Sequence, residues 1–300
     1  MTDPAQIIEA VEGLTISQGP QAGDRLKLAS FQRQFIEGSF APGVNIGCLS
    51  VGRGGGKTAL SAALAVTHLL GEWDDQPQRE IVVAARTRDQ ARTCWAFACS
   101  FLGETPGIKI RRGAALEIEF EDGNGPHLLK AVPSTGKAVL GGSATLAIMD
   151  ERAAWMESRG DEMESALLTS LGKRNGRALL ISTSAPDDAN SFSRWLDSPP
   201  SGCYTQEHRA DPDLPANDWE SLLQANPGSL EGIGATREWL ENAAKQAIER
   251  GGSALASFRN LHRNERVNIE TRALLIDLAQ WEGCEAVSYT HLRAHETVLD

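Results

Sequence analysis

The residues best suited to phosphate chemistry are glycines followed by a lysine and a threonine. They form the run Gly52-Arg53-Gly54-Gly55-Gly56-Lys57-Thr58, between an apolar stretch and an alanine- and leucine-rich one. Backbone N–H groups can surround phosphate oxygens where side chains leave room, a lysine neutralises the phosphates, and the next hydroxyl can ligate Mg²⁺. The run therefore predicts a phosphate-binding loop, with Gly54, Gly55 and Gly56 as its cradle and Lys57 and Thr58 in the last two roles.

Arg53 adds a positive charge inside this loop. A guanidinium at this place can stabilise charge on a phosphoryl group while it is transferred. The alternative is an arginine that faces solvent or DNA. The usual pattern of such loops also has glycine at the position of Val51, so the loop departs from that pattern at its first residue.

Two acids, Asp150 and Glu151, follow directly after a second apolar stretch. An aspartate at the end of a central strand can hold Mg²⁺, and the adjacent glutamate can polarise an attacking water. A third apolar stretch ends in Ser182-Thr183-Ser184. Hydroxyls beside these acids can sense a γ-phosphate, although an ordinary strand end would have the same pattern. Thr183 and Ser184 are therefore candidate nucleotide-binding residues.

Buried strands and helices must bring these residues to one edge of the fold. Apolar runs predict strands at 44–51, 81–85, 116–120, 128–132, 145–149 and 178–183. Helical spacing or composition predicts helices at 26–40, from the loop to Leu70, at 88–101 and at 161–171. Short apolar strands that alternate with helices indicate an α/β fold, with a mainly parallel central sheet flanked by helices.

The composition divides the chain into segments. Residues 1–24 are polar and contain Gly and Pro, which predicts a loose N-terminal arm, and 25–186 hold the core. Two amphipathic helices are expected within 235–264, in a region otherwise rich in Asp, Pro, Ser and Asn. We therefore expect 187–265 to form a small subdomain beside the sheet, and 266–286 to be a linker.

Bulk composition limits the class of protein. The net charge of −11 gives no support to permanent nucleic-acid binding, although a transient contact through one small face is compatible with an acidic chain. Five cysteines without a C-x-x-C pair argue against a disulfide framework or a zinc site, and predict small buried apolar residues in a reducing cytosol. No apolar run is long enough to span a bilayer, and the first residues lack a secretory signal pattern.

Taken together, these segments resemble the large terminase subunits of tailed phages. The phosphate loop of that family characteristically lacks the first glycine and has an early arginine, as Val51 and Arg53 do here. Phe31-Gln32-Arg33-Gln34-Phe35 looks like the family's adenine-contacting motif, with Gln32 as the matching residue, and Ser182-Thr183-Ser184 resembles its coupling motif. Further similar segments are residues 84–91, Asn226-Pro227-Gly228, Phe258-Arg259-Asn260 and Trp281-Glu282-Gly283-Cys284.

The resemblance implies a P-loop NTPase of the additional-strand, conserved-glutamate (ASCE) type, with residues 187–265 as its lid, that uses ATP and Mg²⁺. Thr58 and Asp150 would hold the metal, Glu151 would activate water, and Lys57 and Arg53 would stabilise the transition state. The nucleotide-binding set would be Gln32, Gly52, Arg53, Gly54, Gly55, Gly56, Lys57, Thr58, Thr183 and Ser184.

The resemblance also implies partners for the complete protein. It would package double-stranded viral DNA into a procapsid in the host cytoplasm, with no membrane involved. It would work as a homo-oligomeric ring on the portal protein, with the small terminase subunit recognising the genome. The family's RNase H-like nuclease would begin beyond these residues, so endonuclease activity is not expected of this chain.

Two alternatives come from other functional classes. The same loop occurs in small-molecule kinases, although the adjacent Asp150 and Glu151 favour water as the acceptor. The chain could also be a nucleotide-binding fragment that is inactive without neighbouring subunits in a ring. ATP hydrolysis without an added acceptor would distinguish an ATPase from a small-molecule kinase. The concentration dependence of turnover would distinguish an active enzyme from a fragment that needs its ring neighbours.

The last fourteen residues, 287–300, look like a translated sequencing adapter. Val287 to Thr297 match, without exception, one reading frame of a transposon-end adapter used in shotgun libraries, and that frame also allows Ala286. The alternative is a natural tail in which His291 and His295 could suggest a metal site. We expect the adapter, and we expect the natural protein to continue past Ala286.

Overall fold

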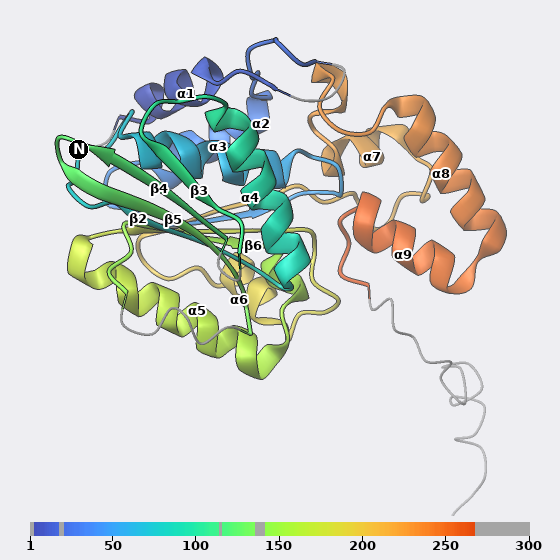
Figure 1. Ribbon diagram of the computed structural model, residues 1–300. Helices are drawn as coiled ribbons and strands as arrows, with labels where there is room; N and C mark the ends of the chain where they lie inside the picture. Colours follow the sequence, from blue (N-terminus) through green and yellow to red (C-terminus); the bar gives the residue numbers. More distant parts are fainter. Residues whose placement is uncertain (1–2, 18–20, 114–115, 136–141, 268–300) are drawn as a thin grey trace, which may run out of the picture.

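A computed structural model describes residues 3–17, 21–113, 116–135 and 142–267 of the chain. Its centre is an eight-stranded sheet in the order β3-β4-β5-β2-β6-β7-β1-β8 (Figure 1). The strands are β1 Ile46–Ser50, β2 Glu80–Ala85, β3 Ile108–Arg111, β4 Leu116–Asp122, β5 Gly125–Pro133, β6 Leu146–Asp150, β7 Arg177–Ser182 and β8 Cys203–Glu207. Five neighbouring pairs, from β5 to β8, are parallel, and β3 and β4 extend one edge as antiparallel strands. The finding confirms the mainly parallel α/β sheet.

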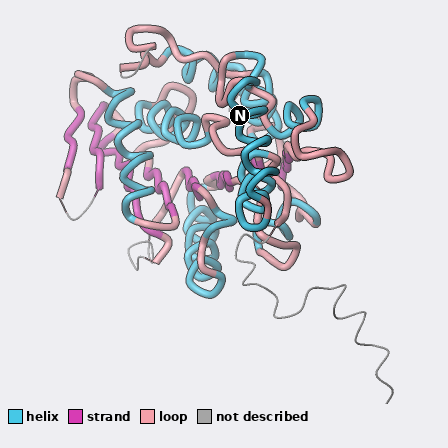
Figure 2. Tube along the Cα trace, turned by 90° about the vertical axis from the view of Figure 1, so that its right-hand side faces the viewer, coloured by secondary structure: helices cyan, strands magenta, loops and turns pink. Residues whose placement is uncertain are grey.

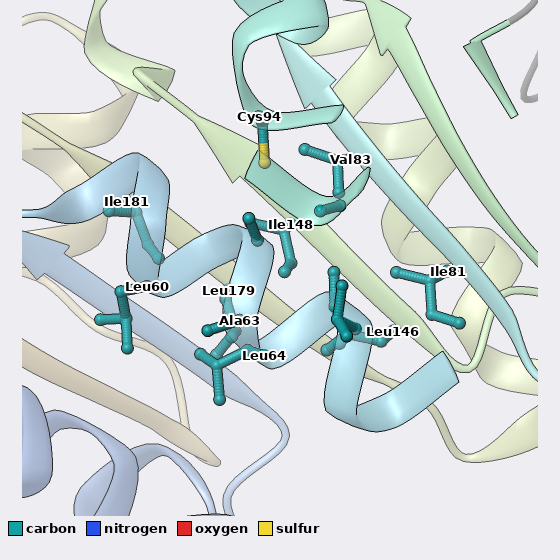
Figure 3. Close-up of a cluster of buried hydrophobic side chains, with 14 of the residues drawn as sticks. Leu60, Ala63, Leu64, Ile81, Val83, Cys94, Leu146, Ile148, Leu179 and Ile181 are labelled. Carbon is teal, nitrogen blue, oxygen red and sulfur yellow. The ribbon is translucent and has the colours of Figure 1, made fainter. Parts of the chain in front are cut away.

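Helices cover both faces of the sheet (Figures 1 and 2). On one face lie α1 Pro4–Gly13, α2 Ser30–Ser39, α3 Lys57–Leu70 and α4 Arg88–Leu102, and on the other α5 Glu157–Leu171 and α6 Ser191–Asp197. Side chains alternate between the faces as a strand requires: Ile148 packs with the first group of helices, and Met149 with the second. Small residues of α3 such as Ala63 let that helix approach the sheet closely (Figure 3).

The lid region lies beside the sheet rather than on it (Figure 1). It contains α7 Trp219–Ala225, α8 Arg237–Arg250 and α9 Gly252–His262, with a separate small apolar core around Leu240 and Phe258. The two helices predicted within 235–264 are thus present as α8 and α9.

The prediction of a loose N-terminal arm over residues 1–24 is wrong for Pro4–Gly13, which form helix α1. Asp3 caps the first turn of α1, and Pro4 occupies a position where its missing N–H costs nothing. Ile7 and Val11, one helical turn apart, are fully buried in the main core. The polar composition hid this helix because two apolar side chains on one face are enough to anchor it.

The core also extends past the boundary expected at residue 186. β8 pairs in parallel with β1, from Ile46 opposite Cys203 to Ser50 opposite Glu207, and forms one edge of the sheet. Its half-buried, partly polar residues resemble an ordinary loop, so hydrophobic pattern alone gave no strand there. The lid proper therefore begins after this strand. Of the expected linker and adapter, residues 268–300 lie outside the described residues.

Cysteine usage agrees in part with the expectation. Cys48 and Cys94 are buried, whereas Cys99 and Cys203 are half-buried, and all four are free thiols. Cys284 lies outside the described residues. Within the described ranges, no helix combines the length and apolarity needed to cross a membrane.

Truncation of Ile7 tests whether α1 is part of the core. Ile7→Ala should lower the free energy of unfolding by about 2–4 kcal/mol, because it removes methylene groups from a filled interior. The measurement is urea unfolding followed by circular dichroism. Glu9→Ala, on the exposed side of the same helix, is the matched control and should change little. Equal effects of the two substitutions would mean that α1 does not pack in solution.

Candidate active site

The glycine-rich loop joins the end of β1 to the start of α3. Gly54 and Gly56 have φ of 92° and 73°, in the left-handed region that glycine adopts without strain. Gly56 immediately precedes α3, so the N-terminal N–H groups of that helix face the loop. Val51, at the position where other loops have glycine, is fully buried, and its N–H donates to the carbonyl of Ser182 at 3.1 Å. This valine therefore extends the pairing of β1 with β7 by one residue, and its buried side chain lies at the start of the loop.

Lys57 is the buried cation of the loop. Its Nζ donates to the carbonyls of Val51 at 3.1 Å and Gly52 at 3.2 Å, and lies 3.7 Å from Glu151 Oε1. Burial lowers the pKa of Lys57, and the carboxylates of Glu151 and Asp150 oppose that change. A buried ammonium held by neutral carbonyls gains from an anionic partner, which suits it to phosphate.

Asp150 ends β6 in an environment that suits a divalent metal. Its Oδ2 accepts a hydrogen bond from Thr58 Oγ1 at 3.4 Å, whereas its buried Oδ1 has no hydrogen-bond partner among the described residues. Burial, and then the neighbouring Glu151, raise the pKa of Asp150 to about 7. A carboxylate and a hydroxyl oxygen together form the hard-oxygen donor set that Mg²⁺ prefers, and the unsatisfied Oδ1 fits a ligand role.

Glu151 lies beside Lys57 and the end of β7. Its backbone has φ of 50°, which is uncommon for a residue with a side chain. Its Oε2 accepts from Thr183 N and Thr183 Oγ1, each at 3.3 Å, and from Ser182 Oγ at 3.5 Å. The hydroxyl of Thr183, predicted to sense phosphate, thus contacts the glutamate in this structure.

Ser184 lies one residue beyond this contact and is held from the other side. Its N–H donates to Asn264 Oδ1 at 2.6 Å, and its carbonyl accepts from Asn260 Nδ2 at 3.2 Å. The Ser184 hydroxyl is buried without a partner among the described residues. The structure therefore places Thr183 and Ser184 within the acidic site, but fixes them mainly through their backbone.

The lid contacts the loop directly. The N–H of Gly52 donates to the carbonyl of Ala225 at 3.0 Å, and the N–H of Arg53 to that of Leu261 at 2.6 Å. A Cβ at Gly52 would lie 2.8 Å from the Ala225 oxygen, so only glycine fits there. The exposed Arg53 lines a cavity of about 430 Å³ together with Trp239 and other lid residues. Its side chain thus faces the junction of loop and lid.

Gln32 connects α2 to the loop. Its Oε1 accepts from Ala29 N at 3.1 Å, and its Nε2 donates to the carbonyl of Gly55 at 3.3 Å. A cavity of about 630 Å³ lies near this contact and is lined by Leu60 of α3 and by Ile233 of the lid, whose Cγ2 approaches Gly56. The remaining walls come from the segment 21–28, from α4 and from Ile16, Ala59, Glu231 and Gly232, and most of their surface is apolar.

The sequence predicted that five residues share one site, and in the structure they lie together and contact one another: Lys57, Thr58, Asp150, Glu151 and Thr183. It missed the lid residues that hold the loop and the end of β7: Ala225, Leu261, Asn260 and Asn264. Two of these contacts use backbone carbonyls, which have no sequence signature. The run Phe258-Arg259-Asn260 is similar to a segment of the family, but the sequence assigned it no role.

Comparison with known proteins identifies the family. A model of the terminase large subunit ATPase domain matches residues 44–196. A terminase large subunit of Enterobacteria phage HK97 is 31% identical over 306 residues, an alignment that covers 95% of this chain and 57% of that protein. This chain belongs to the terminase large subunits. It spans little more than half the length of the HK97 relative.

Solved structures agree with this assignment. The crystal structure of the HK97 large terminase has a TM-score of 0.76 and 26% identity, covering 89% of this terminase chain and 56% of that chain. The large terminase ATPase domain of Thermus phage P74-26 has a TM-score of 0.55 at 19% identity, covering 80% and 94% respectively. The second similarity supports the fold. The family model is that of an ATPase domain, and residues 44–196, which it matches, include the phosphate loop and the two acids.

The raised pKa of Asp150 predicts how its replacement acts on stability. The carboxyl pKa is 3.8 in an unfolded chain and about 7 in the fold, so the fold loses stability as pH rises between these values and the proton leaves. Asp150→Asn, which stays neutral, should therefore stabilise the protein in EDTA at pH 8 by roughly 2–4 kcal/mol, and by much less at pH 5.

Denaturant unfolding at the two pH values measures this effect. Asp213→Asn, at an exposed loop position, is the control and should show no such pH dependence. A gain from Asp150→Asn that is larger at pH 5 than at pH 8 would contradict the assigned burial of the charge.

Proposed function

We propose that this terminase chain binds and hydrolyses MgATP, and that hydrolysis drives translocation of double-stranded viral DNA into a procapsid. One observation carries the proposal: Lys57, Thr58, Asp150 and Glu151 converge beside a glycine loop that two lid carbonyls hold. A phosphate loop, a metal ligand and a general base in contact with a subdomain that has its own core are the parts that a nucleotide-driven motor needs.

Phosphate binding would use the loop and Lys57. The N–H groups at the start of α3, with the glycine cradle, favour an anion at this point. Lys57 Nζ would exchange its bonds to the Val51 and Gly52 carbonyls for phosphate oxygens, which form stronger charge-assisted hydrogen bonds. Arg53 would stabilise charge on the transferred phosphoryl group from the lid side of the loop.

Thr58 and Asp150 are the residues that would hold Mg²⁺. When bound, the ion neutralises phosphate charge and favours the ionised form of Asp150. Glu151 would accept a proton from the attacking water. Its Oε2 receives two hydrogen bonds from Thr183, which fix the position of the carboxylate, and its Oε1 remains to accept the proton.

The adenosine moiety would occupy the 630 Å³ cavity beside α3. The cavity adjoins the loop through Ile233, and its mainly apolar walls suit a flat base. Gln32, which already bonds the carbonyl of Gly55, would link base recognition to the position of the loop. Thr183 and Ser184 would complete the nucleotide-binding set on the γ-phosphate side.

The complete protein would act in the host cytoplasm as a homo-oligomeric ring on the portal protein, with the small terminase subunit selecting the genome. The family assignment supports this view. A nuclease would belong to the part of the protein beyond this chain.

Glu151→Gln should separate binding from hydrolysis. Loss of the base should reduce single-turnover hydrolysis by about 100-fold or more, whereas MgATP affinity should change little. Lys57→Ala should instead lose affinity. Quenched-flow assays and nucleotide titrations measure the two quantities, and Glu162→Gln, exposed on α5, serves as the control. If Glu151→Gln kept wild-type hydrolysis while Asp150→Asn lost it, the assignment of the base would be wrong.

Packaging by the full-length protein tests the motor function. Wild-type protein, procapsids and linear double-stranded DNA with ATP should yield DNA that is protected from nuclease, whereas Glu151→Gln should yield none. A motor needs turnover at every step, so loss of hydrolysis must stop translocation. Protection by Glu151→Gln equal to that by wild type would refute ATP-driven translocation, even if the chain is an ATPase.

A further inference from the structure

The segment that follows the lid is joined to the catalytic edge of the sheet by Asn264. This residue is fully buried, and its backbone has φ of 51°. Its Oδ1 accepts from Ser184 N at 2.6 Å, and its Nδ2 donates to Ser50 Oγ and to the carbonyl of His208, both at 2.8 Å. One amide thus binds the ends of β7, β1 and β8.

Asn260, one helical turn earlier on α9, holds the same strand end. Its Nδ2 lies 3.2 Å from the carbonyl of Ser184, 3.4 Å from that of Ala185 and 3.0 Å from that of Glu265. Both backbone polar groups of Ser184 therefore bond to this pair of residues, which we call the asparagine clasp (Asn260 and Asn264). Each asparagine is at least nine-tenths buried.

The clasp determines where Thr183 lies. The carbonyl of Thr183 and the N–H of Ser184 belong to one planar peptide unit, so a bond to that N–H also orients Thr183. Thr183 in turn donates twice to Glu151 Oε2. A continuous path of hydrogen bonds and one peptide plane thus connects Asn264 to the carboxylate of Glu151.

The same end of α9 also holds the phosphate loop. The carbonyl of Leu261 accepts from Arg53 N at 2.6 Å, and that of His262 accepts from Asn226 Nδ2 at 2.7 Å. A displacement of α9 would therefore move the loop through backbone bonds and the end of β7 through the clasp. The phosphate loop and the general base, Glu151, would therefore shift together.

We propose that Asn264, with Asn260, is a positioning residue that holds Thr183 against Glu151. The position of the general base, Glu151, would then depend on lid helix α9. The inference rests on the proposed ATPase function. Asn264 itself touches neither nucleotide nor water in this scheme. It acts through Thr183, and its loss leaves the phosphate loop and the metal ligands in place.

Asn264→Gly in the full-length protein tests the clasp. Glycine tolerates the positive φ, so the substitution removes the amide without straining the backbone. The single-turnover rate of ATP hydrolysis should fall by about tenfold, with the KM for ATP unchanged within about twofold. Asn175→Gly is the matched control: that residue has φ of 48°, is exposed and precedes β7, at the opposite end of the strand from Thr183, so the rate of this variant should not change.

A second measurement separates positioning from general damage. In a Glu151→Gln background, Asn264→Gly should cause less than about a threefold further loss, because the residue acts through a group already removed. A full tenfold loss in both backgrounds would overturn the proposal. Ser50→Ala, which removes one acceptor of the Asn264 amide, gives the same test if Asn264→Gly fails to fold, with a smaller expected loss of rate.

The outcomes also distinguish the two proposals. A wild-type rate in Asn264→Gly, beside an active wild-type protein, would overturn the clasp alone. A wild-type full-length protein that binds ATP but hydrolyses none under packaging conditions would overturn the ATPase proposal and the clasp with it.

Discussion

The strand order β6-β7-β1 is the constraint on which the site depends. Parallel strands end at one edge, so this order places Asp150, Ser182 and Ser50 side by side, although 100 residues separate Ser50 from Asp150 along the chain. The loop after β1 can then meet the acids after β6. The burial that raises the pKa of Asp150 and lowers that of Lys57 comes from the helices that cover both sheet faces. An order that moved β6 away from β1 would separate the cation from its two carboxylates.

Part of this arrangement is encoded locally, and could be predicted from the sequence. Continuous apolar runs specified the central strands, since only doubly covered strands tolerate them. Glycines before Lys57 specified the loop, because the left-handed φ values at Gly54 and Gly56 favour glycine over residues with a side chain. Asp150 and Glu151 were identified because two acids directly follow a buried strand.

Other parts depend on contacts that no local pattern records. β8 is half-buried and partly polar, and its strand conformation comes from pairing with β1. α1 is anchored mainly by Ile7 and Val11, its two buried residues, in a largely polar segment. Asn264 looks like an ordinary loop asparagine until the strand ends are brought to it. In each case tertiary context, rather than propensity, decides the structure.

The asparagine clasp has a consequence for the way the protein is made. Ser50 emerges from the ribosome early, yet its partner Asn264 follows more than 200 residues later. Non-local pairings of this kind close slowly, and each requires the later segment to be present. β1 likewise waits for β7 and β8 on its two sides. The edge that holds the site is therefore completed late in synthesis: a nascent chain carries the residues of the phosphate loop long before it carries the segments that hold that loop and Ser184 in place.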